Sequence, residues 1–303
     1  YLDHERDATV KVFAPTDFGF RKVYIERPLR LDVDLSESEP GRFRNASTLD
    51  EYCLWMQQQF GADVAERLAE LAAEVTAHVE DQEGLSLLRA TEGAAKADVT
   101  TAEKGCRRIL SSLLDTQMWA ERGELTKLLR SLRTAAKKTE WMDYNAFLDA
   151  LERHAKANDE RLTAGRIKAI RAWVATTNPK AARVIDKAVP RTDKRNEKYG
   201  VFKVEGLRVS FERDTDLGDS ERVPLLDDIE AYFDREVLPH VPDAWINADK
   251  RDARDDQIGI VGYEINFNRY FYRYTPPRPL AVIDEELKQI EREIAELLNE
   301  VAE

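Results

Sequence analysis

The sequence has little of the chemistry that cross-links a chain or holds a metal. Its 303 residues include two cysteines, Cys53 and Cys106, and four histidines. Two cysteines form neither a disulfide framework nor a zinc-binding set, and their scarcity is typical of a reducing, cytoplasmic compartment. The histidines stand far apart in the sequence, at His4, His78, His154 and His240. We therefore expect a fold that depends on its apolar core, without disulfides or a structural metal.

Long apolar runs are also missing. No stretch reaches the length of a membrane-spanning helix and no secretory signal opens the chain, so we expect no membrane association. The net charge of −12 is untypical of a protein that binds nucleic acid by itself, although net charge does not describe local patches. The length suggests two domains, or one domain with extensions.

The motifs of common enzyme classes are absent as well. The sequence contains no glycine-rich dinucleotide loop, no Walker phosphate loop, no nucleophile elbow and no zinc-ligand spacing. Carboxylates are abundant, but no pair stands out from the background. From the residues alone, the sequence predicts an α+β protein, mainly α, that ends in a helix for binding a partner.

The most regular pattern in the chain is a heptad seam over its last residues. Apolar side chains recur there at alternating spacings of three and four, at Leu280, Ile283, Leu287, Ile290, Ile294, Leu297 and Val301. Glu, Lys and Arg flank this seam, which is narrower than the apolar face of a helix that lies on its own core. A helix of this length is marginal alone in water, so we expect it to pack on another helix, from this chain or from a second protein.

The patterning divides the chain into four parts. Residues 1–46 alternate and are rich in β-branched and aromatic residues, which predicts an extended segment. Residues 47–190 have helical spacing, with a linker or mobile loop expected over 84–104, where two glycines and weak periodicity occur. Residues 199–279 predict a small α+β region with a hairpin and an aromatic, strand-like run. Residues 280–303 are the C-terminal partner-binding helix.

Short polar residues mark the expected starts of helices. The N-cap candidates are Ser47, Asp143, Thr163 and Asn178. Because Pro179 follows the last of these at the first helical position, a helix is expected across Val184, Ile185 and Val189.

Beyond Tyr199 the period changes to two. Alternation on both sides of Glu205-Gly206 predicts a two-residue hairpin loop. Pro224 is then expected to open a short helix that ends near Pro239.

Basic residues gather on the predicted helical region. Residues 104–138 contain nine Lys or Arg against three acidic residues, and residues 151–198 are also basic. One interpretation is a surface for the phosphate backbone of DNA. Its candidate contacts are Arg107, Arg108, Lys127, Arg130, Arg133, Lys137 and Lys138. The alternative is a solvated face in a charge-rich protein, because no groove-reading motif accompanies the charges.

Long sequence stretches resemble one known family. VPLLDDIEAYFDREVLPHVPDAWI (223–246) and GYEINFNRYFYRYTPPRPLAVIDEELKQIEREIAELL (262–298) are similar to the C-terminal part of modification (methyltransferase) subunits of type I restriction-modification systems. KVFAPTDFGFRKVYIERPLRL (11–31) looks like the segment that follows the catalytic domain in that family. MDYNAFLDALERH with LTAGRIKAIRAWVATTNPKAARVI, from 142 to 185, resembles the helical spacer between them.

The resemblance implies an adenine-N6 DNA methyltransferase complex. In that family two modification subunits and one specificity subunit assemble, a restriction subunit can join, and S-adenosylmethionine supplies the methyl group. The C-terminal helices of the modification subunit pack on helices of the specificity subunit, which reads the DNA target. By this likeness the heptad seam contacts the specificity subunit, and DNA is met through the complex.

The catalytic motifs of that family are missing from this sequence. It lacks the acidic-x-Phe-x-Gly-x-Gly loop for the cofactor and the Asn-Pro-Pro-aromatic motif that holds a flipped adenine. The Pro276-Pro277 pair has Thr275 before it and Arg278 after it, so it cannot perform that role and is expected to stiffen the chain instead. We therefore expect a C-terminal fragment of a larger subunit, inactive by itself and without a cofactor site.

Two other function classes stay open. The terminal helix could make a homodimeric coiled coil in a structural protein without any methyltransferase link. The basic helices could instead make the chain a DNA-contacting module.

Overall fold

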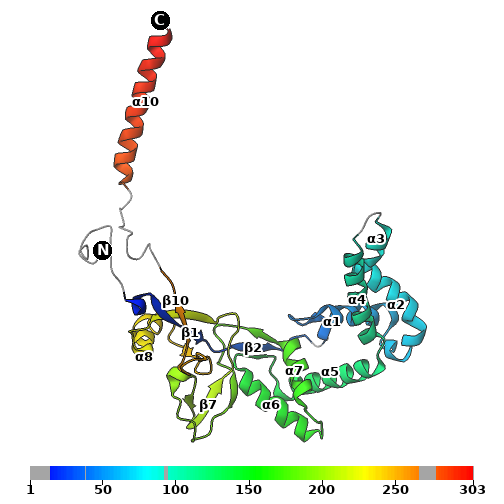
Figure 1. Cartoon of the computed structure of the whole chain (residues 1–303). Helices are drawn as coiled ribbons and strands as arrows, with labels where there is room; N and C mark the ends of the chain where they lie inside the picture. Colours follow the sequence, from blue (N-terminus) through cyan, green and yellow to red (C-terminus); the bar gives the residue numbers. More distant parts are fainter. Residues whose placement is uncertain (1–13, 38, 92–94, 266–277, 303) are drawn as a thin grey trace.

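The computed structural model describes residues 14–37, 39–91, 95–265 and 278–302 (Figure 1). More of these residues lie in helices than in strands, and the strands form three small antiparallel sheets. The predicted class, α+β and mainly α, is therefore confirmed.

The α-helices range from four to 23 residues in length. They are α1 (Thr48–Phe60), α2 (Leu68–Gln82), α3 (Leu85–Ala90), α4 (Lys96–Leu113), α5 (Thr116–Ala136), α6 (Tyr144–Ala157), α7 (Ala164–Val174), α8 (Ile229–Tyr232) and α10 (Leu280–Ala302). Short turns of 3₁₀-helix are η2 (Pro15–Phe18), η3 (Pro40–Arg42), η4 (Val64–Glu66) and η5 (Glu197–Tyr199), and η6 (Phe233–Val237) is a π-helical turn.

The strands are short and widely spaced in the sequence. They are β1 (Gly19–Glu26), β2 (Leu31–Asp34), β3 (Glu140–Trp141), β4 (Ala175–Thr177), β5 (Ile185–Ala188), β6 (Phe202–Val204), β7 (Leu207–Phe211), β8 (Asp219–Pro224), β9 (Trp245–Ile246) and β10 (Ile260–Tyr263). The sheet orders are β10-β1-β8 with β9 also on β1, β3-β2-β4, and β5-β7-β6.

Local polar residues fix the helix starts as predicted. The Ser47 hydroxyl accepts a hydrogen bond from the Asp50 N–H, and the Asp50 carboxylate accepts one from the Ser47 N–H, which completes a capping box. Asp143 and Thr163 likewise accept from backbone N–H groups in the first turns of α6 and α7. These caps satisfy donors that have no partner inside the helix.

Helices α1 to α4 and the start of α5 enclose one apolar core. It contains the fully buried side chains of Met56, Val75, Val79, Leu85 and Leu113. Both cysteines lie in this core. The buried positions on α2 repeat every three or four residues, which is the spacing that predicted the helix.

A second core joins α5, α6 and α7 to strand β2. Phe147 and Leu151 of α6 are fully buried there beside Val33 and Leu35. The sheet β3-β2-β4 lies against this core because Val33 pairs with Trp141 on one side and Ala175 on the other. The segment 1–46 is thus divided between cores, since β2 packs with helices that follow it by about a hundred residues in the sequence.

Three strands, β8, β9 and β10, pair with β1. Val23 and Ile25 of β1 are buried with Phe233 of η6 and Ile246 of β9.

The predicted hairpin is present as β6 and β7, with Val204 opposite Leu207. Its loop residues Glu205 (φ 49°) and Gly206 (φ 83°) both have positive φ, as a type I′ turn requires.

Three sequence-based expectations are wrong over part of their range. Within 84–104, expected as a loop, the described residues are helical over Leu85–Ala90 and from Lys96 onward. Buried Leu85 and Cys106 hold these helices on the first core, and tertiary packing outweighs the weak periodicity. Nothing in the structure tests the mobility expected for that stretch.

The helix expected after Asn178 is also absent, because Ile185–Ala188 is strand β5. The Asn178 side chain accepts from the Lys180 N–H as a helix cap would, yet the Val184 N–H donates to the Leu29 carbonyl. Backbone pairing with residues that are distant in the sequence therefore replaces the helix that was expected here. Similarly, Pro224 ends β8, and Asp228 caps the short helix that follows.

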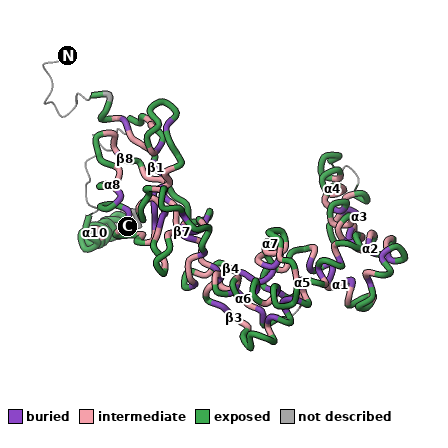
Figure 2. Tube along the Cα trace, turned by 90° about the horizontal axis from the view of Figure 1, so that it is seen from below, coloured by how far each residue is buried: buried purple, intermediate pink, exposed green. Residues whose placement is uncertain are grey.

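Helix α10 stands apart from the rest. Figure 1 shows it beyond the sheet around β1, away from every other labelled element, and Figure 2 colours its tube exposed. Residues 266–277, which include most of the predicted aromatic run and the Pro-Pro pair, lie outside the described residues. The helix itself covers almost all of the predicted range 280–303.

Candidate partner-binding and nucleic-acid interfaces

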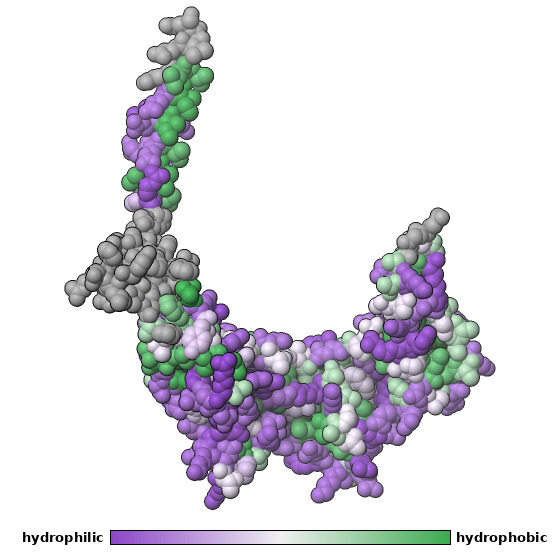
Figure 3. Space-filling view, in the orientation of Figure 1, coloured by the Kyte–Doolittle hydropathy of each residue, from purple (hydrophilic) through white to green (hydrophobic). Residues whose placement is uncertain are grey.

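The predicted seam lies on one exposed side of α10. Leu280, Leu287, Ile290, Ile294 and Leu297 are each between 51% and 79% exposed. Ile283 is half-buried, and the Val301 side chain lies outside the described residues. Figure 3 shows the apolar atoms along one side of the helix and polar atoms along the other. The structure therefore brings the described seam residues together, and none of the other labelled elements covers them.

The apolar side is wider than the sequence analysis proposed. Val282 and Leu298 are 44% and 65% exposed, and neither was included in the seam. Leu298 follows Ile294 by four residues, so the i, i+4 spacing alone could have identified it. An exposed apolar stripe of this width is typical of a helix that packs on a broad partner surface.

The flanks of this stripe are strongly acidic. Residues 280–302 contain seven Asp or Glu against two Lys or Arg, a difference of five negative charges. Two copies of such a helix side by side would place like charges close to one another, which is unfavourable. A partner with basic residues beside an apolar groove is a better match for this helix than a second copy of it.

The predicted DNA contacts lie on two helices and are not all neighbours. Arg107 and Arg108 are exposed on α4, whereas the others are on α5 or just after it. Lys127 and Arg130 line a hollow of about 630 Å³, together with Arg42 of η3. Lys137 and Lys138 are exposed beyond the last turn, and Arg133 is half-buried. The structure thus gathers two of the seven residues at one place.

Two of the four cations that line that hollow are paired with carboxylates. Arg130 forms an ion pair with Glu39, and Arg122 forms a buried ion pair with Asp50. The Lys138 ammonium lies 5.3 Å from the centre of the Trp141 ring, in a cation–π contact. Within the described residues, Lys127 and Arg42 are left without an acidic partner. These pairings reduce the attraction of the α5 surface for phosphate.

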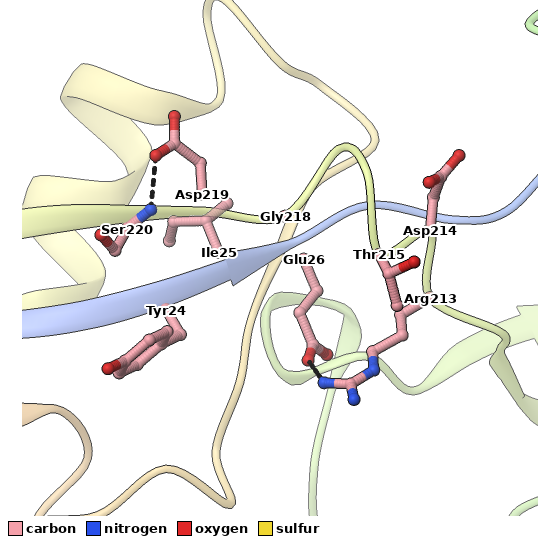
Figure 4. Close-up of a pocket in the computed structure, with 9 residues that line it drawn as sticks. All are labelled: Tyr24, Ile25, Glu26, Arg213, Asp214, Thr215, Gly218, Asp219 and Ser220. Carbon is pink, nitrogen blue, oxygen red and sulfur yellow. Dashed lines mark hydrogen bonds and ion pairs between the residues drawn. The ribbon is translucent and has the colours of Figure 1, made fainter. Parts of the chain in front are cut away.

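A shallow hollow lined by polar and charged side chains lies beside β1 (Figure 4). Its volume is about 350 Å³, and Glu26 accepts hydrogen bonds there from Arg213, Trp245 and Asn247. Figure 4 shows the Asp214 carboxylate and the Tyr24 ring pointing in different directions, away from Glu26. These polar groups do not converge on a common point, so the hollow has no catalytic arrangement.

One serine–histidine contact resembles part of a nucleophilic site. Ser131 Oγ lies 2.7 Å from His154 Nε2, across α5 and α6. The Asn158 amide lies 3.4 Å from the same ring nitrogen, and the contact is exposed. No carboxylate among the described residues bonds the other ring nitrogen to orient the base. The pair is therefore a surface contact between helices, lacking the third member that nucleophilic catalysis needs.

The cysteines are buried thiols. Burial raises the pKa of Cys53 to about 11, and burial also raises the pKa of Cys106. Neither is a reactive thiolate at neutral pH. Across the residues described, no cluster of three or more His, Cys, Asp or Glu side chains is arranged to hold a metal ion.

Comparison with known proteins gives no assignment. No family model, no curated protein and no solved structure matches this chain. No helix in the described parts of the chain is both long enough and apolar enough to cross a membrane.

Proposed function

We propose that this chain is the C-terminal part of a modification subunit of a type I restriction-modification system, working in the cytoplasm as an assembly module. Helix α10 would dock on helices of the specificity subunit. The observation that carries this proposal is the exposed apolar stripe of α10 with its acidic flanks. The resemblance of 223–246 and 262–298 to that family supports the choice of this partner, and the missing cofactor and Asn-Pro-Pro-aromatic motifs agree with a non-catalytic part.

The wider complex follows from the same proposal. A second modification subunit and a restriction subunit would join through the specificity subunit. S-adenosylmethionine would bind a catalytic domain that this sequence does not contain. Tight binding of S-adenosylmethionine to the purified chain would contradict this arrangement.

Substitution of Leu287 tests the docking surface. Leu287→Asp places a charge in the apolar stripe, and a buried Leu side chain contributes about 1.5–3 kcal/mol. Since 1.4 kcal/mol is a factor of about ten in affinity, we expect at least tenfold weaker binding to the specificity subunit by titration calorimetry. Ile290→Asp should behave in the same way.

Gln289→Asp is the matched control. Gln289 is exposed and lies outside the predicted heptad seam, and its substitution adds the same negative charge to the same helix. It should leave the affinity almost unchanged. If Leu287→Asp and Gln289→Asp bind equally well, the stripe is not the docking surface.

Light scattering separates the alternative function. A self-associating structural protein would be a homodimer by itself and would ignore the specificity subunit. The five excess negative charges of α10 disfavour that outcome. A dimer that Leu287→Asp dissociates, and that does not change when the specificity subunit is added, would favour the alternative.

A further inference from the structure

We infer that a hollow formed by residues 190–208 binds the phosphate backbone of a nucleic acid. It lies between the loop after β5, the turn η5 and the hairpin β6–β7, with a volume of about 730 Å³. It belongs neither to α10 nor to the α5 surface, so the inference is independent of the docking function. None of the seven candidate DNA contacts named from the sequence lies in it, although Arg191 and Lys194 belong to the basic stretch 151–198.

One arginine side chain, that of Arg208, attaches the loop that forms the hollow to strand β7. The Arg208 guanidinium donates hydrogen bonds to the carbonyl oxygens of Pro190, Asp193 and Arg195, at 3.3, 2.6 and 2.7 Å. The Val189 N–H donates in turn to the Arg208 carbonyl at 2.8 Å. Three bonds from one side chain fix the loop on strand β7 before any ligand arrives. A ligand that binds there does not have to order the loop, which favours affinity.

The lining is strongly cationic in an acidic protein. Six Lys or Arg and two acidic residues line the hollow, a local excess of four positive charges where the whole chain has −12. Arg191, Lys194 and Lys203 are exposed, and within the described residues none of them has an acidic side chain at ion-pair distance. Three unpaired cations thus face one hollow, two from the loop and one from β6.

The local excess of four positive charges already counts both acidic residues, Glu197, which is exposed, and Asp193, which is paired within the loop. Asp193 accepts hydrogen bonds from the Arg195 guanidinium and N–H, which lower the pKa of Asp193 to about 2. The Asp193 carboxylate therefore already forms an ion pair inside the loop and stabilises it. Lys198 is engaged by Asp234 at 2.7 Å and Glu230 at 3.3 Å. The three free cations define the surface that a phosphate would meet.

The shape favours a polymer over a small anion. The hollow is wide and open, and its free cations come from separate segments. They match a ligand with several successive phosphates. The hollow beside α5 is a weaker candidate because Arg130 and Arg122 are paired there with Glu39 and Asp50.

The test is binding of a fluorescent DNA duplex to the full chain, followed by anisotropy at increasing salt. Neutralising three phosphates gives a slope of log K against log salt of about −2.7, so affinity should fall about 40-fold between 50 and 200 mM salt. The combined variant Arg191→Ser, Lys194→Ser, Lys203→Ser should lose at least tenfold in affinity at 50 mM salt, with a slope near zero. Far-UV circular dichroism should show that it remains folded.

The matched control removes three exposed cations elsewhere, with Arg107→Ser, Lys127→Ser and Arg130→Ser. It should retain the affinity and the slope of the unchanged protein. Arg208→Lys keeps the charge but loses the three carbonyl contacts, so it should weaken binding without reducing the slope. Tripolyphosphate at the same phosphate concentration should fail to displace the duplex.

Four results would overturn the inference. They are no binding at 50 mM salt, equal binding by the loop variant, loss of binding in the control instead, and displacement by tripolyphosphate. The last would identify a small-anion site. Docking to the specificity subunit should not change in any of these loop variants. A negative result for DNA binding would therefore not contradict the proposed role of α10, which the Leu287→Asp experiment tests separately.

Discussion

The buried ion pair between Asp50 and Arg122 provides the sharpest test of how the helical region is held together. Asp50 lies in the first turn of α1, and Arg122 lies in α5, 72 residues later. Their side chains are only 4% and 9% exposed. The Arg122 guanidinium also lies 5.3 Å from the centre of the Trp173 ring on α7. One side chain therefore connects α1 of the first core to α7 of the second.

Arg122→Met should lower the free energy of unfolding by about 3–5 kcal/mol. Methionine keeps most of the apolar volume, so the loss arises because the Asp50 carboxylate stays buried without its cation. Asp50 Oδ2 retains the hydrogen bonds from the Ser47 N–H and hydroxyl, at 2.8 and 2.6 Å, which satisfy only part of that charge. A loss of this size is a large part of the 5–15 kcal/mol typical of a folded domain.

The assay is urea unfolding followed by tryptophan fluorescence and far-UV circular dichroism. Trp119 lies in the first core and Trp173 in the second, so fluorescence reports on both sides of the ion pair. The control is Arg67→Met. Arg67 pairs with Glu70 on the surface, where the two side chains are 43% and 70% exposed. An exposed pair contributes about 0.2–1 kcal/mol, so this variant should unfold almost as the unchanged protein does.

A double variant separates the buried charge from simple loss of packing. Asp50→Asn combined with Arg122→Met removes both charges and should be more stable than Arg122→Met alone. Equal, small losses for Arg122→Met and Arg67→Met would refute the reasoning, because the buried pair would then contribute no more than a surface pair.

Two further predictions concern a thiol and a turn. Cys53, with its pKa raised to about 11 by burial, should be about 0.1% thiolate at pH 8, and it should react with a disulfide reagent only after urea unfolds the chain. Immediate reaction of Cys53 in a Cys106→Ser variant would contradict this. Gly206→Val should destabilise the hairpin by at least about 1 kcal/mol in urea unfolding, because a β-branched residue is strained at φ 83°. Leu207→Val, at an exposed strand position beside it, is the control and should change stability by less than about 0.5 kcal/mol.

Features that depend on neighbouring residues were predictable from the sequence. The caps at Ser47, Asp143 and Thr163 are present because each polar side chain reaches a backbone N–H two or three residues ahead. The Glu205-Gly206 turn follows from the positive φ that a two-residue hairpin loop requires. Helix α10 was predicted for the same reason, since its apolar spacing is a property of one continuous segment.

Features that depend on distant strands were not predictable in this way. Pro224 was expected to open a helix, but it is the last residue of strand β8, which pairs with β1 about 200 residues earlier in the sequence. Strand β5 was expected as helix, and Ile185 pairs instead with Phe211 of β7. A short segment with weak preferences adopts the conformation that its pairing partner imposes, and that partner is not visible in local sequence.

The same distinction between neighbouring and distant residues applies to the candidate interfaces. The sequence by itself determined that the last helix carries an apolar seam, because helical geometry places residues three and four apart on one side. Only the tertiary structure decided which cations are free, since an ion pair joins residues that are far apart in the chain. Arg130 meets Glu39 and Arg122 meets Asp50, whereas Arg191, Lys194 and Lys203 have no such partner among the described residues. Charge counted along a sequence cannot separate these cases, because neutralisation depends on distances that folding creates.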